Sequence, residues 1–310
     1  MGAQLRVYRR QIKATQSTQK ITKAMELIAA SRIVKAQNRV KQARPYVTEL
    51  TRALAAMGKD ASLKHPMLTG VENPRRVGIL LITSDRGLAG GYSSNAIKTA
   101  NQLMAQVRAD GKEPVLYIIG RKGVGYFRFR GLSYADSWTG FSEQPNFVDA
   151  RSATETVVAA LLATSAGESH GEPGIDELHV VYTKFESMVT QTATSAQVSP
   201  VSIEEAVESA PEEESDGPKP AYDFEPEPTE LLAELLPRYV SARIFSALLE
   251  SAASESAARR RAMKSASDNA SDLIKTYTRL ANQARQAEIT QEISEIVGGA
   301  DALASAGSDY

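Results

Sequence analysis

The chain between Arg238 and Val297 reads RYVSARIFSALLESAASESAARRRAMKSASDNASDLIKTYTRLANQARQAEITQEISEIV. These positions contain neither glycine nor proline and are rich in Ala, Leu, Glu, Gln, Arg and Lys, which all favour helix. At 1.5 Å per residue they predict one helix roughly 90 Å long, which no domain of this size can surround. Apolar residues recur along it every three or four positions, as in a coiled-coil seam: Val240, Ile244, Ala247, Leu248, Leu273, Tyr277, Leu280, Ala281, Ala284 and Ala287.

A second long helix is predicted at the other end of the chain, because Ala3 to Arg44 again lacks glycine and proline. Its apolar residues form a sparser stripe: Ile12, Ile21, Met25, Ile28 and Val40. Pro45 predicts an end near Arg44, and a short helical piece from Val47 to Met57 follows. The two long helices can pair antiparallel if the residues between them fold into a domain that brings its own ends together. Pairing of each helix with its own copy in a homodimer is the alternative.

Residues 74–201 predict a small Rossmann-like α/β domain. Strands are expected at Arg76–Ser84, Val115–Ile119 and Glu177–Phe185, and helices at Ser94–Arg108 and Phe147–Ala163. Such alternation is typical of a parallel sheet, which Thr192–Pro200 would close as an edge strand. The predicted fold class is therefore α/β plus a long antiparallel two-helix coiled coil. Its parts are an N-terminal coiled-coil helix (1–58), the α/β domain (74–201), a connector (202–228) and a C-terminal coiled-coil helix (229–310).

Charge is segregated along the chain, although its net charge is only −1. Residues 1–44 carry eleven Lys and Arg against one acid, Glu26, whereas residues 202–230 carry eleven acids against one lysine, Lys219. The acidic stretch is rich in proline, which is typical of a disordered linker, but Tyr222 and Phe224 inside it equally favour a docking point. Pro237 predicts a kink or a restart in the helix that follows.

The composition excludes several kinds of site. The chain has no cysteine, so thiolate chemistry and disulfides are excluded, and three widely spaced histidines do not predict a zinc site. No apolar run approaches the eighteen or so residues that a bilayer span requires. The N-terminus has no signal-peptide core, and Arg6 stands where a myristoylation motif needs Ser or Thr. We expect a protein of the cytosol or of the cytosolic face of a membrane protein.

Two glycine-rich loops follow the first two strands, at Gly87–Gly91 and Gly120–Gly123. Neither matches a dinucleotide fingerprint or a Walker A loop, so we interpret both as tight turns and expect no cofactor. No nucleophile motif accompanies the histidines. The basic N-terminal helix lacks the aromatic residues and the fold of a nucleic-acid reader, so no nucleic-acid partner is expected. The residues alone indicate a non-catalytic mechanical or scaffolding protein.

Four strings resemble signatures of one family, the γ subunits of F-type ATP synthases. They are KITKAMELIAAS at residues 20–31, SDRGLAGG at 84–91, YDFEPEP at 222–228 and ARQAEITQEISEIVGGA at 284–300. They stand in the family's order and span nearly the whole chain.

The resemblance implies the central stalk of a bacterial rotary motor. The two terminal helices would turn inside a ring of α and β subunits, and the α/β domain would sit against the c-subunit ring, beside ε. Ion flow through the membrane sector would drive ATP synthesis at the β subunits, so the chain is expected to have no catalytic residues of its own. Membrane contact is expected only through partner subunits, on the cytoplasmic side of the cell membrane.

The resemblance also implies which residues meet partners. Those matching positions that face the β subunits are Met25, Arg259, Gln286, Thr290, Glu292, Ile293, Ile296 and Val297. Those matching the foot that meets the c ring and ε are Tyr222, Phe224, Glu225 and Glu227. The apolar tip from Ile289 to Leu303 would make the isolated chain prone to aggregation. The loop Ser165–Gly174 is longer than the fold requires, and we expect it to face the c ring or ε.

Two hypotheses of other classes predict different measurements. A Rossmann-type enzyme would bind a nucleotide at Gly87–Gly91, which calorimetry with NAD, ATP and S-adenosylmethionine would detect. A coiled-coil adaptor would be a homodimer in solution.

Overall fold

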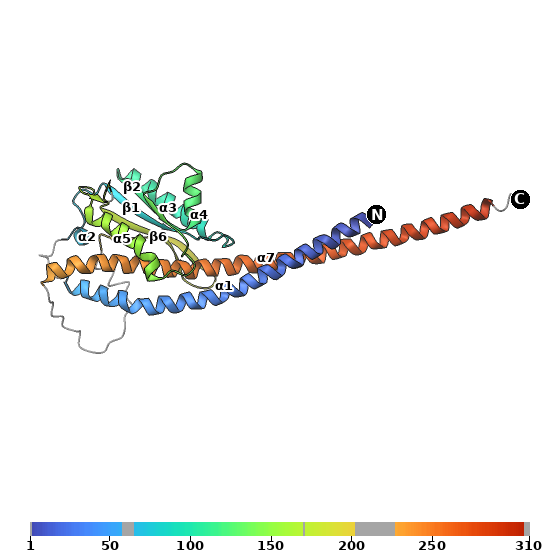
Figure 1. Cartoon of the computed structure of the whole chain (residues 1–310), viewed down its shortest axis with the longest axis horizontal. Coiled ribbons are helices and arrows are strands. Elements are labelled where there is room, and N and C mark those ends of the chain that lie inside the picture. The colour runs from blue at the N-terminus through green and yellow to red at the C-terminus, as the bar shows by residue number, and fades with distance from the viewer. Residues whose placement is uncertain (1, 58–64, 170, 202–226, 307–310) are drawn as a thin grey trace. The chain divides into compact units, whose positions relative to one another are not determined.

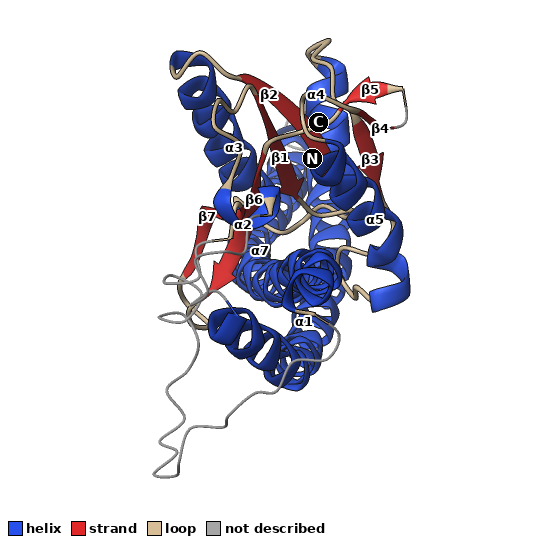
Figure 2. Ribbon diagram, turned by 90° about the vertical axis from the view of Figure 1, so that its left-hand side faces the viewer, coloured by secondary structure: helices blue, strands red, loops and turns tan. Residues whose placement is uncertain are grey.

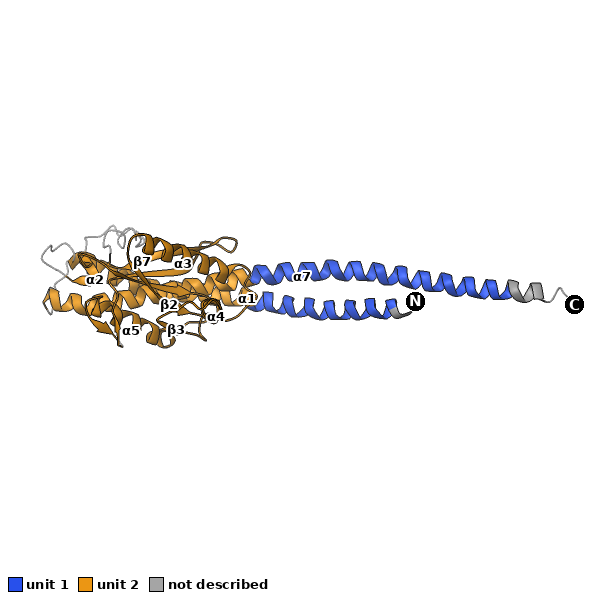
Figure 3. Cartoon of the chain, turned by 90° about the horizontal axis from the view of Figure 1, so that it is seen from above, with its two compact units in different colours: residues 1–28, 260–310 blue, residues 29–259 orange. Residues whose placement is uncertain are grey.

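The computed structural model describes residues 2–57, 65–169, 171–201 and 227–306. It divides into two compact units, residues 29–259 and residues 1–28 with 260–310 (Figure 3). The helices α1 (Gly2–Met57) and α7 (Pro228–Ala306) each contribute residues to both units.

The larger unit, residues 29–259, contains a five-stranded sheet in the order β3-β2-β1-β6-β7. The strands are β1 (Arg76–Ile82), β2 (Glu113–Ile119), β3 (Asp136–Trp138), β6 (Glu177–Phe185) and β7 (Gln191–Ser199). The first four are parallel, and β7 pairs antiparallel with β6 at the edge. The predicted α/β class is confirmed. The loop Ser165–Gly174 contains a small pair of strands, β4 (Glu168–Ser169) and β5 (Glu172–Pro173).

Helices cover both faces of this sheet (Figures 1 and 2). Helices α3 (Tyr92–Ala109) and α4 (Arg121–Phe129) pack on the face to which Val77, Ile79 and Leu81 point. Helix α5 (Phe147–Ala163), the short α2 (Pro66–Thr69) and the parts of α1 and α7 in this unit pack on the face of Leu80 and Ile82. Burial on both faces explains why β1 reads as a continuous apolar run.

Two prolines lie inside the long helices. Helix α1 runs through Pro45 and α7 runs through Pro237, so the predicted helix end at Arg44 is wrong and α7 does not restart at Pro237. A proline removes one helical hydrogen bond. Both prolines lie in the larger unit, where burial of neighbouring side chains such as Leu50 and Leu236 offsets that cost.

The smaller unit consists of two helical segments, residues 2–28 of α1 and 260–306 of α7, which lie side by side and run in opposite directions (Figure 3). The predicted antiparallel coiled coil is confirmed, and both of its helices belong to the same chain. Its buried side chains are mostly small or polar: Thr22, Glu26, Met263, Ser267, Ala270 and Ala281. Ile21 and Ile28, which were expected in the seam, are 58% and 53% exposed. The predicted stripe on α1 is therefore wrong at Ile21 and Ile28, whereas Ile12 and Met25 are half-buried and Ala281 of the predicted α7 seam is buried.

Candidate functional site

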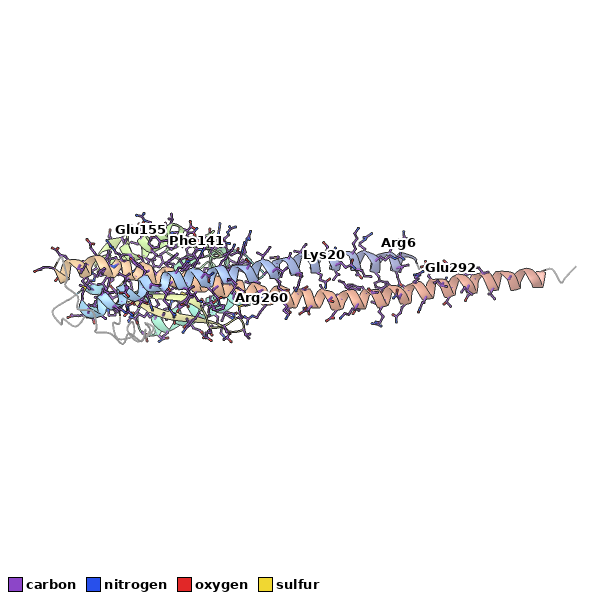
Figure 4. The ribbon with its side chains drawn as sticks, turned by 90° about the horizontal axis from the view of Figure 1, so that it is seen from below. Arg6, Lys20, Phe141, Glu155, Arg260 and Glu292 are labelled. Atoms are coloured by element: carbon purple, nitrogen blue, oxygen red, sulfur yellow. The ribbon has the colours of Figure 1, made fainter. Side chains whose placement is uncertain are left out.

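The last turns of α7 form an exposed apolar tip. Ile289, Ile293, Ile296 and Val297 are between 45% and 71% exposed, and Gln286, Thr290 and Glu292 are exposed as well. Figure 4 labels Glu292 on this stretch, which continues beyond the start of α1. Ile289, Ile293 and Ile296 follow each other at four and three positions, so they share one face of the helix. The side chain of Leu303 lies outside the described residues.

The smaller unit also exposes apolar side chains on α1. Val7, Ile21, Leu27 and Ile28 are each more than half exposed, while Met25 is half-buried. Such residues are interspersed with Lys and Arg, as the labels Arg6 and Lys20 in Figure 4 illustrate. This unit therefore combines a small-residue seam with apolar and basic residues on the outside.

The predicted foot is described only at its end. Tyr222, Phe224 and Glu225 lie outside the described residues. Glu227 is exposed directly before α7, and its carbonyl oxygen accepts hydrogen bonds from the backbone N–H groups of Glu230 and Leu231.

Arg259 does not face outwards. It is 5% exposed, and its guanidinium is used inside the larger unit. Its Nη2 lies 2.7 Å from Glu255 Oε1 and its Nη1 lies 3.3 Å from Glu143 Oε1. The guanidinium also donates to the carbonyl oxygens of Arg86 and Gly87 at 3.3–3.4 Å. The expected contact of Arg259 with a partner subunit is therefore corrected to an internal role.

Arg259 belongs to a charge cluster that joins four parts of the larger unit, with Arg259 and Glu255 buried and Arg86 exposed. Its members are Arg32 of α1, Arg86 of the β1–α3 loop, Glu143 of the β3–α5 loop, and Glu255 and Arg259 of α7. Glu143 is the common partner: it pairs with Arg32 and Arg259, and Arg86 Nη1 lies 3.6 Å from its Oε2. Burial raises the pKa of Glu255 to about 7, although Arg259 beside it acts in the opposite direction.

The glycine-rich loops serve the fold of this unit. The Asp85 carboxylate accepts hydrogen bonds from the backbone N–H groups of Arg121, Gly140 and Ser142, so it ties together the loops that follow three strands. Gly120 has a φ of 102°, and a Cβ there would lie 2.2 Å from the carbonyl oxygen of Thr83. Glycine is therefore required where the loops after β1 and β2 meet.

An open cleft of about 990 Å³ lies beside these loops, between α3 and α4. Its charged lining consists of Arg86, Lys98, Arg121 and Lys122. Two of these are already paired within the unit, Arg86 with Glu143 and Arg121 with Asp85. The cleft has a basic lining without a nucleotide-binding fingerprint.

Sequence reasoning did not find Arg32, Glu143 or Glu255. The only local signal is the spacing of Glu255 and Arg259, four residues apart on one helix, which is also the spacing of many exposed ion pairs.

Among the described residues, no helix has the length and apolarity needed to cross a membrane. A family model described as ATP synthase matches residues 4–303. The ATP synthase gamma chain of Salinispora tropica is 56% identical over 315 residues, and that of Streptomyces avermitilis is 54% identical over 312 residues. Both alignments cover 100% of this chain and 100% of the relative.

Solved structures with a similar fold come from mitochondrial ATP synthases. A chain from the Euglena gracilis OSCP/F1/c-ring structure has a TM-score of 0.65 at 16% identity, covering 98% of this chain and 95% of that one. A chain from the Tetrahymena thermophila central stalk/c-ring structure has a TM-score of 0.56 at 22% identity, covering 80% and 99%. The coverage and identity of the sequence relatives establish the family: the chain belongs to the gamma chains of ATP synthase.

Proposed function

We propose that the chain is the central rotor shaft of an F-type ATP synthase. Its coiled coil turns inside a ring of α and β subunits and couples ion flow through the membrane sector to ATP synthesis or hydrolysis at the β subunits. The chain supplies no catalytic residues and needs no cofactor of its own.

The exposed apolar residues of the smaller unit support this proposal most directly. Val7, Leu27 and Ile28 on α1 and the isoleucines of the tip on α7 lie on the outside of a narrow two-helix rod. A rod of two helices cannot bury such residues itself, so a partner has to surround it. A ring of subunits around the rod meets this requirement.

The partners follow from the family and from the assemblies in which the fold occurs. The similar chains come from structures described as F1/c-ring and central stalk/c-ring. We infer the α and β subunits, ε and the c ring as partners, with membrane contact only through them. The location is then peripheral, on the cytoplasmic side of the cell membrane.

The partner-contact residues are proposals within this function. Met25, Gln286, Thr290, Glu292, Ile293, Ile296 and Val297 are assigned to the β subunits. Tyr222, Phe224, Glu225 and Glu227 are assigned to the c ring and ε. Arg259 is excluded from the first group because it is buried within its own unit.

A tagged copy of the chain, purified from its native membranes under mild conditions, tests the function. We expect recovery of a large complex that contains α and β subunits and hydrolyses ATP. A homodimer without ATPase activity would instead support the coiled-coil adaptor.

The apolar tip leads to a further expectation for the isolated chain. Replacing Ile293 and Ile296 with serine removes two side chains that are 56% and 71% exposed, so self-association measured by light scattering should fall severalfold. Val148→Ser is the matched control, because Val148 is 77% exposed on the other unit. An equal fall in the control would show that the tip has no special role.

A further inference from the structure

In the larger unit, α7 occupies the place where a parallel sheet usually binds its ligand. Ligands bind beyond the carboxyl ends of the strands, at the point where the strand order reverses. Here that point lies between β1 and β6, because β2 neighbours β1 on its other side. The last paired residues of β1 and β6 are Leu81 and Val181. After Val181, the backbone of β6 forms hydrogen bonds with side chains of α7. Ser251 Oγ accepts from the N–H of Thr183, and Ser254 Oγ donates to its carbonyl oxygen.

The apolar residues of α7 that lie against this end of the sheet are small. Between Ser251 and Arg259 the buried apolar residues of α7 are all alanines: Ala252, Ala253, Ala257 and Ala258. Methyl groups let the helix approach closely, but they form shallow ridges that interlock little with a neighbouring surface. Within this stretch, alanine packing therefore resists sliding or turning of α7 only weakly, whereas earlier in α7 larger side chains such as Leu236, Ile244 and Leu248 pack into the domain core.

The charge cluster supplies the interlocking that the alanines lack. Glu143 comes from a loop of the α/β domain, and its carboxylate pairs with Arg32 of α1 and Arg259 of α7. One side chain of the domain thus joins both long helices. These groups are largely buried, with side-chain exposures of 13% for Glu143 and 6% for Arg259. Moving either helix against the domain would separate buried opposite charges, which is costly.

We propose that Glu143, Arg259 and Arg32 form a torque clamp, which fixes the α/β domain to α1 and α7 so that domain and shaft turn together. This inference rests on the rotor function proposed above and adds the residues that transmit the torque. All three are positioning residues, since Glu143 pairs with both arginines within the unit.

The test uses the assembled ATP synthase in inverted membrane vesicles, with the ratio of ATP-driven proton pumping to ATP hydrolysis as the readout. Glu143→Gln keeps the shape of the side chain but removes the charge that both arginines share. We expect assembled enzyme that still hydrolyses ATP, with a pumping-to-hydrolysis ratio reduced severalfold because the shaft slips in the domain. Glu234→Gln is the matched control, since Glu234 lies on α7, is 71% exposed and pairs with Arg238.

A covalent cross-link in place of the Arg32–Glu143 ion pair shows whether a low ratio comes from slippage of the shaft or from poor folding. The chain has no cysteine, so Arg32→Cys with Glu143→Cys places a single pair of thiols across this contact. We expect a low pumping-to-hydrolysis ratio in the double variant. A short bifunctional thiol reagent that joins the two cysteines should restore this ratio. The same reagent should not change the ratio of either single variant. A normal ratio in Glu143→Gln, or no recovery after cross-linking, would overturn the clamp. A wild-type chain that brings no ATPase with it would overturn the rotor function instead.

Discussion

Arg259→Ala should lower the free energy of unfolding of the chain by about 3–5 kcal/mol, because it leaves the buried carboxyl group of Glu255 without its ion-pair partner. Glu255 is completely buried, so water cannot replace the lost guanidinium there, whereas Glu143 keeps its pair with Arg32. The measurement is urea unfolding followed by circular dichroism, in a chain whose tip carries Ile293→Ser and Ile296→Ser to limit aggregation.

The same helix contains a matched control for this experiment. Arg238 also follows a glutamate by four residues, and it lies 3.3 Å from Glu234, but both side chains are more than 60% exposed. Exposed pairs of this kind contribute about 0.3–0.5 kcal/mol, so Arg238→Ala should have a small effect. Similar losses in the two variants would contradict the assignment of Arg259 to a buried cluster.

The second large effect concerns pH and Glu255. Its pKa is raised by burial from an ordinary value of 4.5 to about 7 in the folded chain. Below pH 4.5 the carboxyl is protonated in both states and carries no penalty. As the pH rises towards 7, the unfolded chain releases the proton while the folded chain retains it, so folding becomes less favourable. The loss amounts to about 3 kcal/mol and is complete once the pH exceeds the folded-state pKa.

Glu255→Gln should remove this loss of stability. The stability difference between variant and wild type should therefore shift in favour of the variant between pH 4.5 and pH 7. The comparison with wild type is needed because burial lowers the pKa of His179, which acts in the opposite direction over part of this range. Glu234→Gln serves again as the exposed control. A constant difference between Glu255→Gln and wild type across these pH values would contradict the raised pKa.

Much of the fold could be predicted where local pattern and tertiary structure agree. The expected bounds Phe147–Ala163 and Glu177–Phe185 are confirmed by α5 and β6. A helix of good helix formers and a strand buried on one or both faces can be predicted from the spacing of their own apolar residues. Helix α4 was missed because its sequence RKGVGYFRF contains two glycines, and it forms with Phe127 buried in the core and the N–H of Gly123 donating to Thr83 Oγ1.

Of the candidate site, the apolar tip was predicted and the charge cluster was missed. The exposed tip on α7 followed from resemblance to a family, and its residues are exposed as that assignment requires. The charge cluster had no such signal, because Glu143 lies 111 residues from Arg32 in sequence. Glu255–Arg259 and Glu234–Arg238 share spacing and chemistry, so only tertiary burial distinguishes them. Local sequence contains no record of that burial.

In the smaller unit, α7 continues past the start of α1, so the rod has two helices over most of its length and one at its tip (Figure 3). The resistance of a rod to twisting rises steeply with its thickness, so the single-helix stretch is the softest part of this unit. When torque is applied along the rod, elastic twist should collect in the unpaired end of α7 before it collects in the paired helices. For a given torque the tip would then turn through a larger angle per unit length than the two-helix part of the rod.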